Sequence, residues 1–254
     1  MRDKLWLAAA LCVATALGGC VTTEPRESAP CKPAIATGFI NQSVQVHDKE
    51  SRYVVYVPRE YDPSRPWPLI VFLHGSGERG EDGLWQTDVG LGHAIRQWPE
   101  RFPCLVLMPQ CPKDILWDED KAAMDIIDAT LDKTLRDFNV DPDRIYLTGL
   151  SMGGFATWIY GAQHIDRYAA LMPICGGGRT EDAKALAKVP IWVFHGADDD
   201  GIEPEESRRM VRAITAAGGT IKYTEFPNTK HDAWDPAYAD PESIRWLLAQ
   251  RRKH

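Results

Sequence analysis

The chain has 254 residues, of which 44% are hydrophobic and 26% charged, so it is long enough to bury one substantial core. Its formal net charge of −7, with no basic run before the last few residues, argues against nucleic acid as a partner. The charged fraction and the nine tryptophans are typical of a folded globular protein rather than of a disordered chain.

The first 20 residues predict an export signal. Two basic residues precede an apolar run from residue 5 to 17, which is short for a bilayer span and ends in small residues. Leu17-Gly18-Gly19-Cys20 resembles the bacterial lipobox, in which a peptidase cuts before a lipidated cysteine. We therefore expect residues 1–20 to be a lipoprotein signal peptide and Cys20 to carry a membrane anchor, although an ordinary secretory signal would share most of these features. Because Val21 and not Asp follows the cysteine, the resemblance implies the outer membrane or periplasm if the cell is Gram-negative.

Residues 21–37 are polar, contain three prolines and lack periodicity, which predicts a flexible tether before a single domain at 38–254. The cysteines beyond the signal have no metal-ligand spacing with the histidines, so we expect no metal site and no cofactor. The spacing of these cysteines does not identify a disulfide pair. Cys104 and Cys111 lie at opposite ends of one predicted strand, too far apart to bond to each other.

The domain begins with two strand-like segments, 39–46 and 53–57, whose polar connection predicts an antiparallel hairpin. From residue 69 onward strands and helices alternate, which predicts an α/β fold with a mostly parallel central sheet and helices on both faces. The predicted strands are 69–73, 104–110, 144–148, 169–174, 191–194 and, at an edge, 221–226; the predicted helices are 91–98, 122–138, 205–217 and 241–250. Ligands of such sheets bind at the carboxyl ends of the strands.

A Gly-x-Ser-x-Gly motif, Gly149-Leu150-Ser151-Met152-Gly153, follows the predicted strand 144–148 directly, and a helix-compatible run comes next. A serine on so sharp a strand-to-helix turn has an exposed hydroxyl, and the flanking glycines leave room for the turn. This context predicts that Ser151 is a nucleophile rather than an incidental serine in a glycine-rich loop.

A serine nucleophile needs a neighbouring base that an acid orients, and after such a turn both partners come later in the chain. His164 lies about 20 Å along the helix that starts at the serine. His195 closes a strand, which favours a structural role, and His254 ends the chain. His231, in a loop between the last strand and the last helix, is therefore the predicted base.

The acid is expected in the turn after the strand 191–194, where Asp198, Asp199 and Asp200 are adjacent. Spacing favours Asp199, with Ile202 packing behind it, and Asp200 is the alternative.

Several segments together resemble the α/β-hydrolase superfamily, and closely its bacterial esterase and predicted-peptidase group related to phospholipase/carboxylesterases and feruloyl esterases. In order over residues 39–250, these segments are Leu73-His74-Gly75-Ser76-Gly77-Glu78-Arg79-Gly80, Pro109-Gln110-Cys111-Pro112, Gly149-Leu150-Ser151-Met152-Gly153-Gly154, Pro173-Ile174-Cys175-Gly176-Gly177-Gly178, His195-Gly196-Ala197-Asp198-Asp199-Asp200 and His231-Asp232-Ala233-Trp234. The resemblance implies an α/β-hydrolase fold with Ser151 as nucleophile, Asp199 as acid and His231 as base. Two positions depart from the group, Lys230 in place of Gly and Ile202-Glu203 in place of Val-Pro.

In this fold two backbone N–H groups bind the oxyanion. One belongs to Met152, and for the other we expect Ser76, with Gly75 as the alternative. Glu78 and Arg79 resemble a pair of the group, and we expect them to form an ion pair that braces the loop.

We expect Gln110 and Trp117, which follow a neighbouring strand, to line the substrate pocket, although a core or surface position is an alternative for Trp117. The interval from Cys175 to Val189 is too short for a helical cap, so no cap domain is expected and the site should be open. These features predict a serine carboxylic-ester hydrolase acting on short-chain or polymer-attached acyl or aromatic esters. The alternatives are a serine peptidase or amidase, and a catalytically inactive binding lipoprotein of the cell surface; the oligomeric state cannot be predicted.

Overall fold

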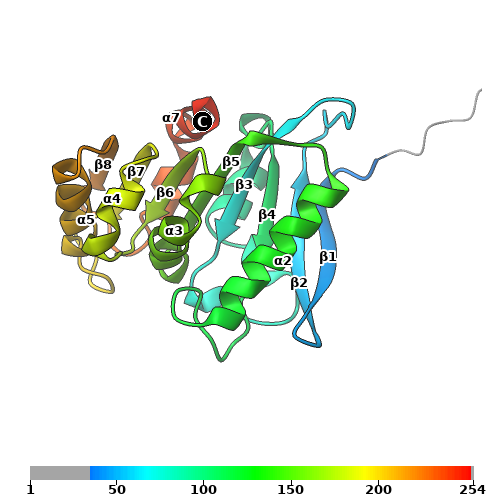
Figure 1. The fold of residues 1–254 in the computed structure, drawn as a ribbon, viewed down its shortest axis with the longest axis horizontal. Helices are drawn as coiled ribbons and strands as arrows, with labels where there is room; N and C mark the ends of the chain where they lie inside the picture. The colour runs from blue at the N-terminus through cyan, green and yellow to red at the C-terminus, as the bar shows by residue number, and fades with distance from the viewer. Residues whose placement is uncertain (1–34, 253–254) are drawn as a thin grey trace, which may run out of the picture. The chain divides into compact units, whose positions relative to one another are not determined.

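One eight-stranded sheet runs through the computed structural model, which describes residues 35–252 (Figure 1). The strand order is β1-β2-β4-β3-β5-β6-β7-β8; β1 pairs with β2 and β2 with β4 in antiparallel fashion, and every other pair is parallel. The strands are β1 (Gly38–Val46), β2 (Lys49–Val57), β3 (Trp67–Leu73), β4 (Leu105–Pro109), β5 (Val140–Leu150), β6 (Ala170–Ile174), β7 (Ile191–Gly196) and β8 (Ile221–Phe226). The predicted hairpin, mostly parallel sheet and edge position of the last strand are confirmed.

The central strands are apolar on both faces because helices cover both faces. Every residue of β3, β4, β6 and β7 is buried, whereas β8 at the edge is only partly buried. The helices are α1 (Leu91–Gln97), α2 (Lys121–Asp137), α3 (Met152–Gln163), α4 (Ala183–Leu186), α5 (Glu205–Ala216), α6 (Trp234–Ala239) and α7 (Pro241–Ala249).

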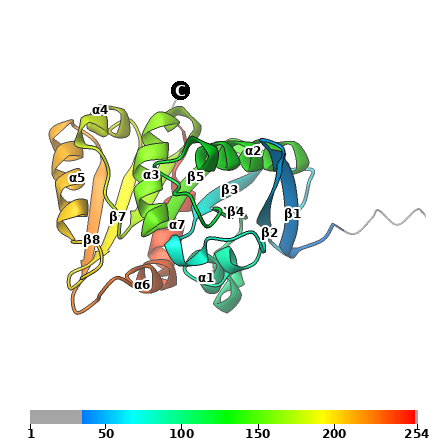
Figure 2. The ribbon, with the colours of Figure 1, turned by 90° about the horizontal axis from the view of Figure 1, so that it is seen from below.

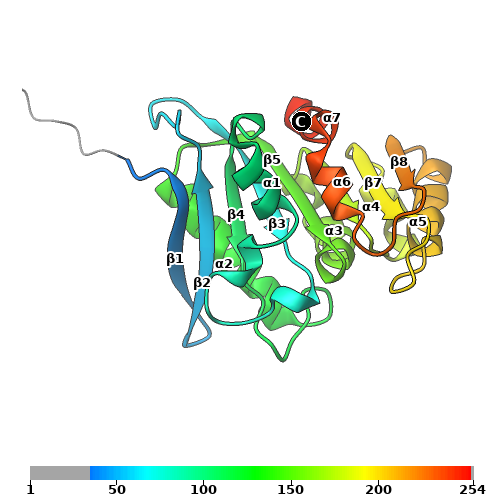
Figure 3. The same ribbon diagram turned by 180° about the vertical axis from the view of Figure 1, so that it is seen from behind.

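Alternate residues of β3 contribute to two separate cores. Leu69, Val71 and Leu73 pack with residues of α2, α3, α4 and α5, whereas Ile70 and Phe72 pack with residues of α1, α6 and α7. Figure 2 shows the two helix layers on either side of the sheet, and Figure 3 shows α1, α6 and α7 on the second face. The period of two along a buried strand therefore divides the core, as the pleat requires.

Several elements differ from the sequence-based expectation: β2 begins at Lys49 rather than at residue 53, and the short helix α4 was not predicted. Strand β5 begins at Val140 rather than at residue 144, because Val140 pairs with Trp67 and extends the strand through Asp141 and Pro142. Helix α6, which the sequence did not predict, follows the loop that carries His231.

Between β6 and β7 lie only a short 3-10 turn and the four-residue helix α4, so the prediction of a domain without a cap is confirmed. None of the helices within residues 35–252 is both long and apolar enough to cross a membrane. The predicted signal peptide, lipobox and most of the predicted tether lie outside the described residues.

Candidate active site

Ser151 occupies the turn between β5 and α3 with a backbone φ of 52°. Such a positive φ is unusual for a residue with a side chain and holds the serine in a strained turn. A Cβ at Gly149 would collide with the carbonyl of Gly153, and a Cβ at Gly153 would collide with the carbonyl of Leu73. The two glycines of the motif are therefore required because α3 packs directly on the ends of β5 and β3.

His231 lies between the Ser151 hydroxyl and the Asp199 carboxylate. The Ser151 Oγ is 2.9 Å from Nε2 of the imidazole, and Nδ1 is 2.7 Å from Oδ2 of Asp199. In this arrangement the hydroxyl donates to Nε2 and the Nδ1–H donates to the carboxylate, which is the tautomer that a general base requires. The edge of the Trp234 ring packs against the imidazole, with ring centroids 5.2 Å apart.

Asp199 is only 6% exposed, and its second oxygen, Oδ1, accepts the backbone N–H groups of Gly201 and Ile202 at 2.9 Å each. Burial opposes the negative charge, but the hydrogen bonds from His231 and these two N–H groups outweigh burial and lower the pKa of the carboxyl. The neighbouring Asp200 instead forms an exposed ion pair with Lys230, at 2.8 Å. Lys230 is the residue that stands where the resembled group has Gly. Asp199 is thus the aspartate that contacts the imidazole.

A second histidine, His195, contacts the same carboxylate from the interior. Its Nε2 is 2.9 Å from the carbonyl oxygen of Ile202 and 3.2 Å from Oδ2 of Asp199, and its Nδ1 is 2.7 Å from the hydroxyl of Ser207. Burial lowers the pKa of this fully buried imidazole, which favours its neutral form with Nε2–H as donor. The sequence indicated only a structural role for His195, although its position four residues before Asp199 was a usable signal.

Cys175, His195 and Asp199 place potential metal-ligand atoms within 4.8 Å of one another. Burial, with the nearby charge of Asp199, raises the pKa of the Cys175 thiol to about 12, so the thiolate that a metal needs is disfavoured. The ring nitrogens of His195 and the oxygens of Asp199 already have hydrogen-bond partners. Cys175 and His195 therefore suit the support of the Asp199 carboxylate better than the binding of a metal ion.

The loop from His74 to Gly80, which we call the His74 loop, lies against the nucleophile. A Cβ placed on Gly75 would be 3.6 Å from the Cβ of Ser151. His74 is fully buried; its Nδ1–H donates to the Gly75 carbonyl at 2.6 Å, and its Nε2 accepts the N–H of Cys111 at 2.9 Å. Burial lowers the pKa of His74 to about 4, so the neutral ring is what fixes the loop.

Ser76 begins a 3-10 turn that follows Gly75, and Met152 begins α3. The N–H groups in the first turn of a helix have no partner within that helix and lie at the positive end of its dipole. Both turns begin in segments that border Ser151, so their first N–H groups are candidate donors to an oxyanion.

The structure contains no ion pair between Glu78 and Arg79 among the described residues, contrary to expectation. The Arg79 Nε donates to the carbonyl of Ser76 at 3.0 Å. Burial raises the pKa of the Glu78 carboxyl. The backbone N–H groups of Gly75 and of Glu78 itself favour the charged form and lower the pKa, but burial outweighs them. One oxygen of this carboxyl is buried without a hydrogen-bond partner in residues 35–252. Each side chain thus braces the His74 loop through the backbone.

Trp117 has a position different from that expected of a substrate-binding residue, whereas Gln110 lines a surface hollow and also holds the neighbouring backbone. The Gln110 amide is committed to the protein: its oxygen accepts the N–H of Gly83 at 2.7 Å, and its nitrogen donates to the carbonyl of Glu78 at 3.1 Å. Trp117 is fully buried, and its indole N–H donates to the carbonyl of His74 at 3.2 Å. Trp117 therefore belongs to the packing beneath the His74 loop, because it has no surface to offer a substrate.

Comparisons with known proteins identify the family and the fold of this chain. Residues 109–240 match the family model described as the dienelactone hydrolase family. A bifunctional acetylxylan esterase/xylanase from Neocallimastix patriciarum is 28% identical over 151 residues, which are 58% of this chain and 21% of the relative. The next curated relative, from Methylorubrum extorquens, is matched over 50% of its length, so the chain spans half or less of these relatives.

Solved structures resemble this chain over more than four fifths of its length. The crystal structure of a thermostable esterase superposes with a TM-score of 0.78 at 35% identity, covering 84% of this chain and 63% of that one. A feruloyl esterase module from Clostridium thermocellum superposes with a TM-score of 0.63 at 16% identity, covering 85% of this chain and 89% of the module. The α/β-hydrolase fold is thereby confirmed.

Proposed function

Because the chain belongs to the dienelactone hydrolase family, we propose that it is a serine ester hydrolase that works through an acyl-enzyme intermediate. The observation that carries the proposal is the hydrogen-bonded line from Ser151 through His231 to Asp199. A serine hydroxyl is a weak nucleophile at neutral pH, and an adjacent imidazole that a carboxylate orients is the arrangement that activates it.

In the proposed first half-reaction, the Ser151 Oγ attacks the ester carbonyl while Nε2 of His231 takes the hydroxyl proton. Asp199 stabilises the imidazolium that forms, and its low pKa keeps the carboxylate charged at neutral pH. The backbone N–H groups of Met152 and Ser76 stabilise the oxyanion. The imidazolium then gives its proton to the leaving alcohol, and the acyl group stays on Ser151.

In the second half-reaction His231 takes a proton from a water molecule, whose oxygen attacks the acyl carbonyl. The bond between the Ser151 Oγ and the acyl carbon then breaks, the imidazolium returns its proton to Oγ, and the acid is released. Each of these steps uses protein groups and water alone.

We propose short-chain or polymer-attached acyl and aromatic esters as substrates. No cap domain separates β6 from β7, so an ester carried on a bulky chain can approach the carboxyl edge of the sheet. The printed names of relatives, an acetylxylan esterase/xylanase and a feruloyl esterase module, support esters of this kind.

The test is covalent labelling of the full chain by a fluorophosphonate probe, together with hydrolysis of p-nitrophenyl acetate. The wild-type chain should be labelled and active, and Ser151→Ala should lose both properties, whereas Ser43→Ala, an exposed serine on β1, should keep them. Labelling of Ser151→Ala at the wild-type level would exclude Ser151 as nucleophile. Turnover of aminoacyl amides without turnover of esters would replace the esterase by an amidase.

A further inference from the structure

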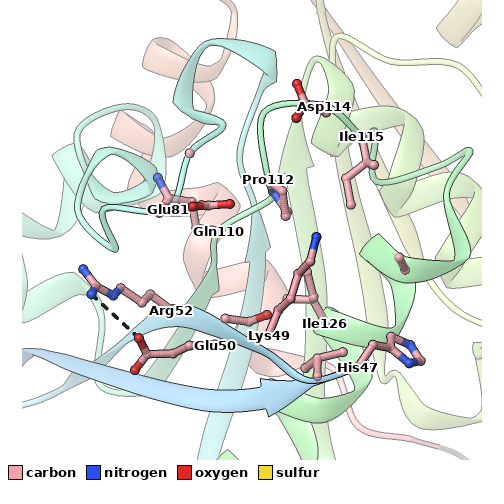
Figure 4. A pocket seen from close by; sticks show the side chains of 14 residues that line it. His47, Lys49, Glu50, Arg52, Glu81, Gln110, Pro112, Asp114, Ile115 and Ile126 are labelled. Carbon is pink, nitrogen blue, oxygen red and sulfur yellow. Dashed lines mark ion pairs between the residues drawn. The ribbon is translucent and has the colours of Figure 1, made fainter.

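A hollow of about 630 Å³ lies beside the His74 loop and outside the triad (Figure 4). Four segments form its walls: the β1–β2 hairpin around its turn, the chain at Gly80 and Glu81, the chain after β4 and the first two turns of α2. None of Ser151, Asp199 and His231 lines it. Its volume is in the range of pockets that bind small molecules or part of a larger one.

The topology places this hollow on the same edge of the sheet as the nucleophile. Ser151 follows β5 and Gln110 follows β4, with β3 between them. Two strand spacings separate these strand ends by about 10 Å. Arg52, opposite Gln110 on β2, is one strand further, because its carbonyl accepts the Gln110 N–H at 3.3 Å. The hollow is thus remote from the reacting bond but reachable along the sheet edge.

Gln110 joins the hollow to the His74 loop. Its side chain lines the hollow while its amide holds the carbonyl of Glu78 and the N–H of Gly83. The His74 loop therefore lies between the hollow and Ser151, and a ligand that spans both must cross this loop.

The lining suits an uncharged ligand that has many hydroxyl groups. Val46, Ile115 and Ile126 give apolar surface, which can contact the carbon-bound hydrogens of a sugar ring. Lys49 and Ser51 offer hydrogen-bond donors, and Glu81 and Asp114 offer acceptors, around the same space.

The charges of the lining disfavour an anionic ligand. Two cationic and three anionic side chains line the hollow, so there is no excess of positive charge to bind a phosphate or a carboxylate. Arg52 is moreover paired with Glu50, at 3.7 Å, as the dashed line in Figure 4 shows.

We propose that this hollow is a remote binding subsite for the saccharide chain of an oligomeric ester whose acyl bond is cleaved at Ser151. The inference rests on the proposed function and adds the substrate class. A small ester reaches only the triad, whereas an oligosaccharide ester can span the roughly 10 Å between Ser151 and the hollow. Contacts made there can lower the transition-state free energy of the reaction, because energy from remote parts of a substrate contributes to kcat/KM.

The experiment compares acetylated xylo-oligosaccharides, from the monosaccharide to the hexasaccharide, with p-nitrophenyl acetate on the full chain. Ala122 lies in the first turn of α2, is exposed and lines the hollow, so Ala122→Trp fills the hollow. Asp132→Trp is the matched control, because it adds the same side chain at an exposed position of the same helix that does not line the hollow.

For the wild-type chain, kcat/KM should rise with oligosaccharide length. In Ala122→Trp the ratio of kcat/KM for the hexasaccharide to that for p-nitrophenyl acetate should fall roughly tenfold, mainly through a higher KM, since the removed contact binds both ground and transition state. In Asp132→Trp the ratio should stay at the wild-type value.

Two results would overturn the inference while leaving the esterase intact: no rise of kcat/KM with oligosaccharide length, or an unchanged ratio in Ala122→Trp, including an equal loss on both substrates. A rise with length for acyl peptides and not for saccharides would also overturn the saccharide assignment. Failure of the wild-type chain to hydrolyse any ester would instead refute the proposed function.

Discussion

Two adjacent aspartates, Asp199 and Asp200, have opposite surroundings. Asp199 is buried, contacts His231 and accepts two backbone N–H groups. Asp200 is exposed and pairs with Lys230 at the surface. A carboxylate that orients an imidazole must hold the Nδ1–H in place throughout the reaction, and only the buried aspartate has this contact.

We predict that Asp199→Asn lowers kcat on p-nitrophenyl acetate by on the order of 10³-fold to 10⁴-fold, because a carboxamide favours the wrong imidazole tautomer and does not stabilise the imidazolium. Asp200→Asn is the matched control and should stay near the wild-type rate, since an exposed ion pair contributes little. The measurement is kcat by initial rates, with circular dichroism to verify folding. A large loss in Asp200→Asn alone would transfer the role of the acid to that residue.

Residue by residue, the sequence was informative where chain order restricts the choice. The strand–turn–helix context singled out Ser151, and elimination among the later histidines led to His231, and the structure joins these two side chains by a hydrogen bond. The sequence was uninformative where contacts between distant loops decide the position of a side chain. Trp117 lies under the His74 carbonyl, and Arg79 turns to the Ser76 carbonyl instead of Glu78. No local pattern encodes which carbonyl a side chain meets in the folded protein.

At the scale of elements, the His74 loop depends on one buried neutral imidazole. Nε2 of His74 accepts the N–H of Cys111, which follows β4, while Nδ1–H donates to Gly75 within the loop. A proton on Nε2 would replace this acceptor by a second donor facing an N–H group. The hydrogen bond that ties the start of this loop to Cys111 is thus made only while His74 is neutral.

We predict that acid weakens the fold through His74. The pKa of histidine is about 6.5 in the unfolded chain and about 4 for His74 in the folded protein, because the ring is buried. Between pH 6.5 and 4, His74 therefore binds a proton in the unfolded chain but not in the folded protein. The free energy of unfolding should fall by about 3 kcal/mol as the pH drops from 6.5 to 4, with no further change from this group below pH 4.

Urea denaturation at a series of pH values measures this dependence. His74→Gln should give a shallower fall of the unfolding free energy between pH 6.5 and 4, whatever its absolute stability. His93→Gln, which removes an exposed histidine of α1, should keep the wild-type slope. Identical slopes in the wild-type chain and His74→Gln would show that His74 does not carry the effect.

The elements themselves were predictable to the extent that burial leaves a hydrophobic pattern in the sequence. Continuous apolar runs marked β3, β4 and β7, because helices cover these strands on both faces. Helix α6 left no such pattern: it has six residues and depends on Ala237 and Tyr238 packing with the core on the α1 face of the sheet. Its place after His231 is set by tertiary contacts that a single segment cannot encode.

At the scale of the whole molecule, the triad and the saccharide subsite that we propose share one uncovered edge of the sheet. The segment between β6 and β7 holds only short helical turns, so within residues 35–252 no inserted domain stands over this edge. An enzyme that acts on esters of a polymer needs such access, because the polymer cannot enter an enclosed pocket. Its position in the cell then decides which polymers it meets.

We predict that lipid on Cys20 holds the protein at a membrane, because residues 17–20 resemble a lipobox. Each methylene of an acyl chain contributes about 0.8 kcal/mol to membrane binding, so several chains on one cysteine hold a protein firmly. In an expressing bacterium, the full chain should incorporate labelled palmitate and sediment with membranes. Cys20→Ser should lose both properties and still hydrolyse p-nitrophenyl acetate, because the change lies far along the sequence from the triad. Cys31→Ser is the matched control and should remain membrane-bound; palmitate incorporation into Cys20→Ser at the wild-type level would refute the anchor.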